Sequence, residues 1–205
     1  MARFEVRPVA SQTKPDSWSH TLILSDTAHL LDVVAQPVWI IALTLSGENC
    51  NERGPELFDV LSDAYQQIEL KIPEALYQTL QARLDQDDDV SVVAVCFTLT
   101  NATIMGKGKF KADIWRGGRQ STLLSGEDQA WHLVEGKWHE TDRWWLMAGD
   151  SKNFTEPTLL EEKNIETIAE TLHGLIAADT TSPAAHTLIA FDAAAPTEIE
   201  ALDLT

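Results

Sequence analysis

The residues Val38–Leu45 constrain the fold more strongly than any other segment of this 205-residue chain. They are nearly all apolar, and several are β-branched. A strand with one face in water alternates polar and apolar side chains, whereas a continuous apolar run of this length is typical of a strand covered on both faces. The chain is therefore expected to place a layer of structure on each side of this strand.

Other segments also have the content of strands. Arg3–Val9 and Lys109–Trp115 alternate apolar and polar residues with the period of a strand. Gly117–Gly118 follows the second of these and predicts a hairpin. The remaining expected strands are Trp18–Leu24, Ser91–Thr98, Thr103–Lys107, Trp131–Val134 with a turn at Glu135–Lys137 into a partner strand, Asp142–Met147 and Thr187–Phe191.

Three helices are expected from apolar residues at helical spacing. The first begins at Pro55 and carries its apolar stripe to Ile68, and the third spans about Asn164–Ala178. Pro73 suits the first turn of the second helix, which ends in the acidic run Asp85–Asp89, expected to be a solvated loop. Helices segregated from antiparallel strands predict an α+β layered sandwich.

Residues 1–192 are expected to form one domain, and the acidic tail 193–205 is expected to fray. The 15 Lys and Arg residues against 32 Asp and Glu residues give a net charge of −17. Such a surface repels nucleic acids and anionic membranes and favours basic partner surfaces. Without an apparent secretory signal or a long apolar run, a cytoplasmic protein is expected, with Cys50 and Cys96 as reduced thiols.

Three segments are similar to motifs of the protein phosphatase 2C family. Gly108–Gly118 resembles the hairpin in which the family has Gly-Asp-Ser-Arg, alternating residues and Arg-x-Gly, with Lys109 in place of the aspartate. Asp142–Asp150 resembles the strand that opens with aspartate and ends in Thr-Asp-Gly or Ser-Asp-Gly. Ala184–Phe191 resembles the closing strand, which the family begins with acidic residues. The resemblance implies a four-layer α-β-β-α sandwich of two mainly antiparallel sheets flanked by helices.

The resemblance also implies a site for two divalent cations, Mg²⁺ or Mn²⁺, which activate a water for attack on a phosphoryl group. Asp16 matches the family's first aspartate, and Ser46–Gly47 stands where the family has Asp-Gly. The third aspartate falls on Gly149, or on Asp150 if the loop slips by one residue, and the fourth falls on Ala184. At most two acids remain, too few for a pair of hard cations that need several carboxylate oxygens.

The leading hypothesis is therefore a pseudophosphatase without a cofactor, acting as a protein-binding or regulatory module whose partner has a basic or phosphorylated surface. The alternative is an active phosphoserine/phosphothreonine phosphatase with Mg²⁺ or Mn²⁺ at a rebuilt site of Asp16, Glu48 and Asp150. A third hypothesis, an unrelated α+β binding protein, predicts that two face-to-face sheets flanked by helices are lacking.

Overall fold

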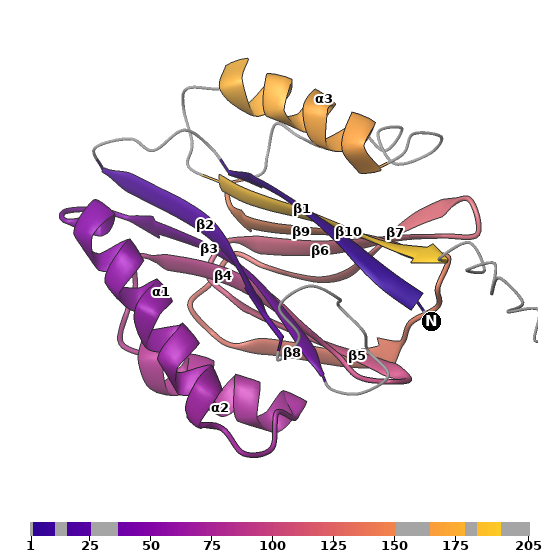
Figure 1. The fold of residues 1–205 in the computed structure, drawn as a ribbon. Coiled ribbons are helices and arrows are strands. Elements are labelled where there is room, and N and C mark those ends of the chain that lie inside the picture. Colours follow the sequence, from indigo (N-terminus) through magenta and orange to yellow (C-terminus); the bar gives the residue numbers. More distant parts are fainter. Residues whose placement is uncertain (1, 11–15, 26–36, 151–164, 179–183, 194–205) are drawn as a thin grey trace, which may run out of the picture.

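Two five-stranded sheets lie face to face between layers of helix in this computed structural model, which describes residues 2–10, 16–25, 37–150, 165–178 and 184–193 (Figure 1). The first sheet has the order β1 (Ala2–Ala10), β10 (Ala184–Ala193), β9 (Arg143–Gly149), β6 (Phe110–Arg116) and β7 (Arg119–Gly126). The second has the order β2 (Ser17–Leu24), β3 (Val38–Ser46), β4 (Val90–Phe97), β5 (Asn101–Lys107) and β8 (His132–Lys137). All the strand pairs are antiparallel.

Helices cover the outer face of each sheet (Figure 1). α1 (Cys50–Gln67) and α2 (Pro73–Leu84) pack on the second sheet, and α3 (Ile165–Ala178) packs on the first. This arrangement confirms the predicted α-β-β-α sandwich of two antiparallel sheets. Within the described ranges, no helix combines the length and the apolar character needed to cross a bilayer.

The strand β3 is covered on both faces, as its apolar run predicts. Val38, Ile40 and Ala42 belong to the core between the sheets, whereas Trp39 and Ile41 belong to the core under α1 and α2. The two sheets also share a buried polar contact, because the hydroxyls of Thr21 on β2 and Thr187 on β10 lie 2.7 Å apart.

The neighbouring tryptophans of β9 lie on opposite faces of the first sheet, as successive residues of a strand do. Trp144 packs between the sheets, while Trp145 packs against α3, and both are buried. Cys50 and Cys96 are both buried and form no disulfide with each other.

Two predicted boundaries are wrong. α1 begins at Cys50 rather than Pro55. The turn before this proline packs on the second sheet through the buried Cys50 and Gly54, and this packing outweighs the helical hydrogen bond that Pro55 cannot make. The turn predicted at Glu135–Lys137 does not form, since β8 runs through these residues and pairs them with Thr103, Ala102 and Asn101 of β5. The predicted tail 193–205 lies, apart from Ala193 in β10, outside the described residues.

Candidate functional site

The predicted site residues gather at one end of the sandwich, where strands of both sheets begin or end. In the second sheet, Ser17 at the start of β2 pairs with Ser46 at the end of β3. In the first sheet, Gly149 at the end of β9 pairs with Ala184 at the start of β10. The Thr44 hydroxyl joins the sheets at this end by donating a buried 3.0 Å hydrogen bond to the Ala148 carbonyl.

Backbone hydrogen bonds hold the loops at this end together. The amide of Gly47 donates to the carbonyl of Asp16 at 3.0 Å, and the amide of Ser46 donates to Asp89 at 3.1 Å. Gly47 has a φ of 95°, a conformation that glycine adopts without strain. These contacts fix the turn at Ser46–Gly47, which the resemblance aligns with the family's Asp-Gly motif.

A cleft of two adjoining cavities opens at this end. The cavities have volumes of about 360 and about 400 Å³ and share Lys109, Glu127, Gly149 and Asp150. The smaller one is also lined by Thr44, Ser46, Asp88, Asp89, Val90, Ser91 and Gln129, and the larger one by Phe110, Lys111, Thr122, Ser125 and Gly126.

The structure brings some of the predicted residues into the cleft and leaves others beside it. Ser46, Lys109, Gly149 and Asp150 line it. Ala184 lies opposite Gly149 in the sheet and is buried, with 2% of its surface exposed. Gly47 follows Ser46 in the adjacent turn.

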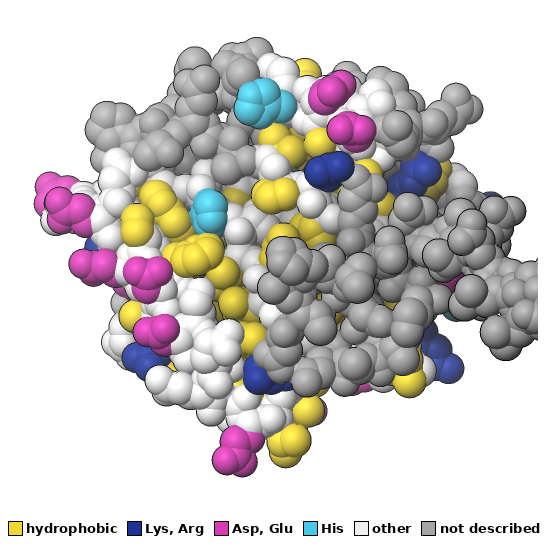
Figure 2. All heavy atoms as spheres, in the orientation of Figure 1, with side chains coloured by type: hydrophobic (Ala, Val, Ile, Leu, Met, Phe, Trp, Pro, Cys, Tyr) yellow, Lys and Arg dark blue, Asp and Glu magenta, His cyan; other side chains and the backbone are white. Residues whose placement is uncertain are grey.

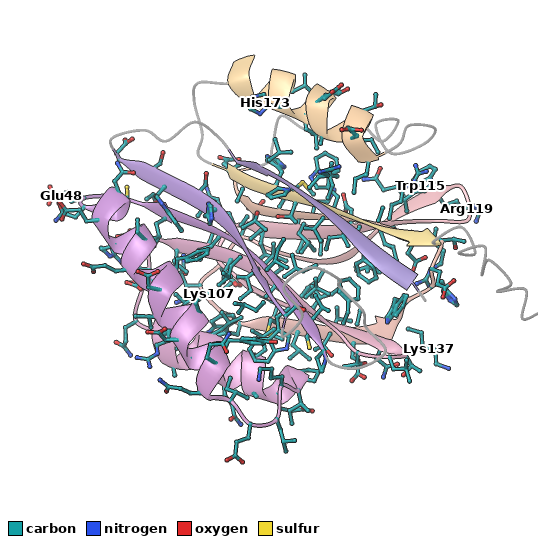
Figure 3. All side chains as sticks on the ribbon, viewed as in Figure 1. Glu48, Lys107, Trp115, Arg119, Lys137 and His173 are labelled. Carbon is teal, nitrogen blue, oxygen red and sulfur yellow. The ribbon has the colours of Figure 1, made fainter. Side chains whose placement is uncertain are left out.

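Asp16 and Glu48 are both exposed and line neither of the two cavities. Figure 3 labels Glu48 at the outer edge of the molecule at this end. Among the residues that the structure describes, no group of three or more His, Cys, Asp and Glu side chains is arranged to hold a metal ion. Metal binding by Asp16, Glu48 and Asp150 stays a prediction.

The carboxylate of Asp150 forms an ion pair with a lysine of this chain. The Lys109 ammonium nitrogen lies 3.6 Å from Oδ2 of Asp150, and the side chains are 54% and 29% exposed. Lys109 is the residue that the resemblance aligns with an aspartate of the family, and here it carries a positive charge into the cleft. A cation drawn to Asp150 would meet the repulsion of this ammonium group.

The acidic lining of the cleft was missed by the sequence analysis, which treated Asp85–Asp89 as a solvated loop. Asp88 and Asp89 line the cleft, and the loop is anchored rather than free. The ammonium of Lys107, 1% exposed, donates to the carbonyls of Leu84, Asp85 and Asp87 at 2.7, 3.1 and 3.1 Å. The sequence contains one signal for this placement: the acidic run comes immediately before β4, whose first residue pairs with the end of β3.

Two landmarks of the family resemblance form an ion pair at the opposite ends of β6 and β9 from the cleft. Nε and Nη2 of Arg116 donate to the two carboxylate oxygens of Asp142 at 2.7 and 2.6 Å. These hydrogen bonds raise the pKa of the Arg116 guanidinium above its ordinary value. Asp142 also accepts from the His139 amide at 2.7 Å and is buried, so the pair is structural.

Comparisons with known proteins identify the fold. No family model and no curated protein matches the sequence. The structure is similar to that of RsbX in complex with magnesium, with a TM-score of 0.65 and 12% identity over 94% of this chain and 100% of that one. It is also similar to the catalytic domain of the serine/threonine protein phosphatase PstP with two manganese ions, with a TM-score of 0.61 and 12% identity over 93% and 98% of the two chains.

A third similar structure carries the family name. The PP2C phosphatase domain and regulatory fragment of SpoIIE from Bacillus subtilis match with a TM-score of 0.62 and 10% identity. The match covers 94% of this chain and 64% of the SpoIIE chain. At these identities the similarities establish the shared fold, and the chemistry has to be argued from this chain's own residues.

Proposed function

Because this chain has the fold of the PP2C-type phosphatases, we propose that it is a catalytically inactive protein with that fold, which acts as a protein-binding or regulatory module. The observation that carries the proposal is the ion pair of Lys109 with Asp150 in the cleft. In this pair, the chain's own ammonium group neutralises the one carboxylate that remains near the family's third acidic position.

The residues at the family's metal-binding positions do not fit Mg²⁺ or Mn²⁺. These hard cations take several oxygen ligands, and carboxylates supply the charge that makes binding favourable. Ser46 offers a neutral hydroxyl, Gly149 has no side chain, and Ala184 has a methyl group. A metal pair is therefore not part of the proposed function.

The charge of the cleft favours a basic partner over a phosphorylated one. Four acids line the two cavities, namely Asp88, Asp89, Glu127 and Asp150, together with the lysines at 109 and 111. The ammonium group of Lys111 pairs with the buried carboxylate of Asp113 at 2.6 Å. Without dications to offset the acids, this lining disfavours phosphate, and the net charge of −17 acts in the same direction.

A phosphatase assay tests the proposal. The pure protein is given a phosphoserine and a phosphothreonine peptide with Mn²⁺, and phosphate release is measured for the native chain and for Asp150→Asn. We expect both proteins to release phosphate at the rate of the protein-free control. Robust Mn²⁺-dependent release that Asp150→Asn abolishes would instead support the active phosphatase with a rebuilt site of Asp16, Glu48 and Asp150.

A rebuilt variant tests the reason for inactivity. Ser46→Asp/Lys109→Ala/Ala184→Asp restores two acids and removes the ammonium group, and we expect it to bind Mn²⁺ more tightly in calorimetry than Lys109→Ala alone. Circular dichroism checks folding, because Ala184 is buried. If the triple variant does not fold, Ser46→Asp/Lys109→Ala is compared with Lys109→Ala. No gain in Mn²⁺ affinity in a folded variant would contradict the role given to these positions.

A further inference from the structure

A second hollow lies on the outer side of the second sheet, between α2 and the strands β5 and β8. It has a volume of about 480 Å³, within the range of roughly 300–1,000 Å³ that is common for ligand pockets. One wall comes from α2 and the other from the strands and the turn that precedes β5. The residues lining this hollow, here called the α2 groove, are Pro73, Glu74, Tyr77, Gln78, Thr98, Asn101, Thr103, Leu133 and Glu135.

Apolar side chains are exposed in and beside the α2 groove. Leu133, in its wall, is 52% exposed. Ile72 and Leu99, each next in sequence to a lining residue, are 42% and 63% exposed. Scattered exposed leucines are ordinary, but an exposed leucine in the wall of a hollow, with exposed apolar residues next in sequence to that wall, is typical of a binding site.

The walls of the α2 groove are held in place by contacts of their own. The side-chain amide of Asn101 donates a 2.6 Å hydrogen bond to Oε1 of Glu135. On the helix side, the side-chain amide of Gln81 donates to the Tyr77 hydroxyl at 2.8 Å. The Tyr77 ring packs edge to face against Trp131, with 5.9 Å between the ring centroids. Binding to walls that are already ordered costs less conformational entropy than binding to mobile ones.

The charged residues that line the α2 groove are all acidic. Glu74 and Glu135 stand on opposite walls, and no Lys or Arg is among the lining residues. Figure 2 shows further acidic side chains gathered along the outer side of α1, the helix beside α2. A second copy of this chain carries the same charge of −17 and would be repelled.

We propose that the α2 groove binds a peptide segment of a partner protein in which an apolar side chain is flanked by Lys or Arg. The apolar side chain packs against Leu133 and Tyr77, and the basic side chains pair with Glu74 and Glu135. Apolar contact supplies affinity, while the charges select the sequence and speed the encounter.

This inference rests on the proposed function only in assigning protein binding to the chain. The α2 groove shares no lining residue with the cleft of Lys109 and Asp150. A phosphatase assay therefore tests the cleft alone, and peptide binding tests the α2 groove alone, so that either can fail without the other.

Selection from a random heptapeptide library displayed on phage, with the full chain as bait, tests the inference. We expect enriched peptides to carry a large apolar residue with Lys or Arg within two positions. The most enriched peptide, made synthetically with a fluorescent label, is then titrated by anisotropy against Leu133→Lys, Glu135→Lys and the control Asp59→Lys. Asp59 is exposed on α1, outside the α2 groove, so its variant matches the charge change of Glu135→Lys.

The expected result is about tenfold or greater weakening in both groove variants and a change of less than about twofold in Asp59→Lys, as expected for a charge outside the binding surface. Equal weakening in all three variants would show that overall charge rather than the α2 groove binds the peptide, and would overturn the inference. Enrichment of acidic peptides, or no enrichment above an unrelated bait, would overturn it as well.

Discussion

Replacing the buried lysine Lys107 with methionine should destabilise the protein and loosen the acidic rim of the cleft. Its ammonium group is 1% exposed and donates to three carbonyls at the end of α2 and in the loop that follows. Methionine has a similar length and fills the space without a donor. The three carbonyls of Leu84, Asp85 and Asp87 would then need other partners.

The magnitude follows from the burial of these carbonyls. The contact with Leu84 is buried, so the loss of its donor costs about 1–3 kcal/mol. The contacts with Asp85 and Asp87 are partly exposed, and water can replace the donor at a cost of about 0.5–1 kcal/mol each. Relief from burying an ammonium group offsets about 1 kcal/mol of this cost, which leaves a net loss of about 1–4 kcal/mol in the free energy of unfolding.

Guanidinium denaturation followed by tryptophan fluorescence measures the loss. The matched control is Lys137→Met, because Lys137 is exposed at the end of β8; Figure 3 labels both lysines. Hydrogen exchange supplies a second readout, since the Ser46 amide donates to Asp89 at the end of the anchored loop and should exchange faster in Lys107→Met. Equal stability of Lys107→Met and Lys137→Met, with unchanged exchange at Ser46, would refute the reasoning.

Three further predictions concern buried charges and thiols. Arg116→Ala removes the bidentate partner of the buried Asp142 carboxylate, which keeps its hydrogen bond from the His139 backbone amide. The free energy of unfolding, measured by urea denaturation, should fall by about 2–4 kcal/mol. A loss no larger than that of the exposed control Arg119→Ala would contradict this. Burial lowers the pKa of His186 to about 4. As the pH drops from 6.5 to 4, this imidazole takes up a proton in the unfolded chain before it does so in the folded protein, so the free energy of unfolding should fall by about 3 kcal/mol. Denaturation curves across this pH window should show a smaller fall in His186→Gln, and an equal fall would exclude this histidine as the cause. Burial also raises the pKa of the Cys96 thiol to about 12, so a thiol-specific colorimetric reagent at pH 8 should react with it only after denaturation, and rapid reaction in the native protein would be inconsistent with the structure.

Much of the fold could be predicted because apolar patterns report burial directly. The run Val38–Leu45 indicated a strand covered on both faces, and the structure places cores on both sides of it. The predicted strand Asp142–Met147 also forms, and its successive residues Trp144 and Trp145 lie on opposite faces of the sheet.

The predicted element boundaries are wrong where a local sequence signal competes with tertiary contacts. Pro55 indicated a helix start, but the turn before it packs on the second sheet through the buried Cys50, and this tertiary contact extends the helix. Glu135–Lys137 has the composition of a turn, yet pairing with β5 keeps these residues extended. Local propensity is a weak guide at such positions because partner strands are distant in sequence.

The candidate site was predicted in its positions but not in its contacts. The resemblance to the phosphatase family placed Ser46, Lys109 and Gly149 at one site, and they line one cleft. The ion pair of Lys109 with Asp150, and the acidic lining from Asp88 and Asp89, depend on loops whose meeting no local pattern reveals.

Calorimetric titration of the pure protein with Mn²⁺ decides whether a chain with the PP2C fold can lack two-metal chemistry, as we propose for this one. At near-neutral pH and physiological salt we expect no binding up to millimolar Mn²⁺, because the resemblance puts Ser46, Lys109 and Ala184 where the family has acids, and the Lys109 ammonium group pairs with Asp150. Two-site binding at micromolar strength would contradict the account and would make this chain a metal-dependent phosphatase candidate.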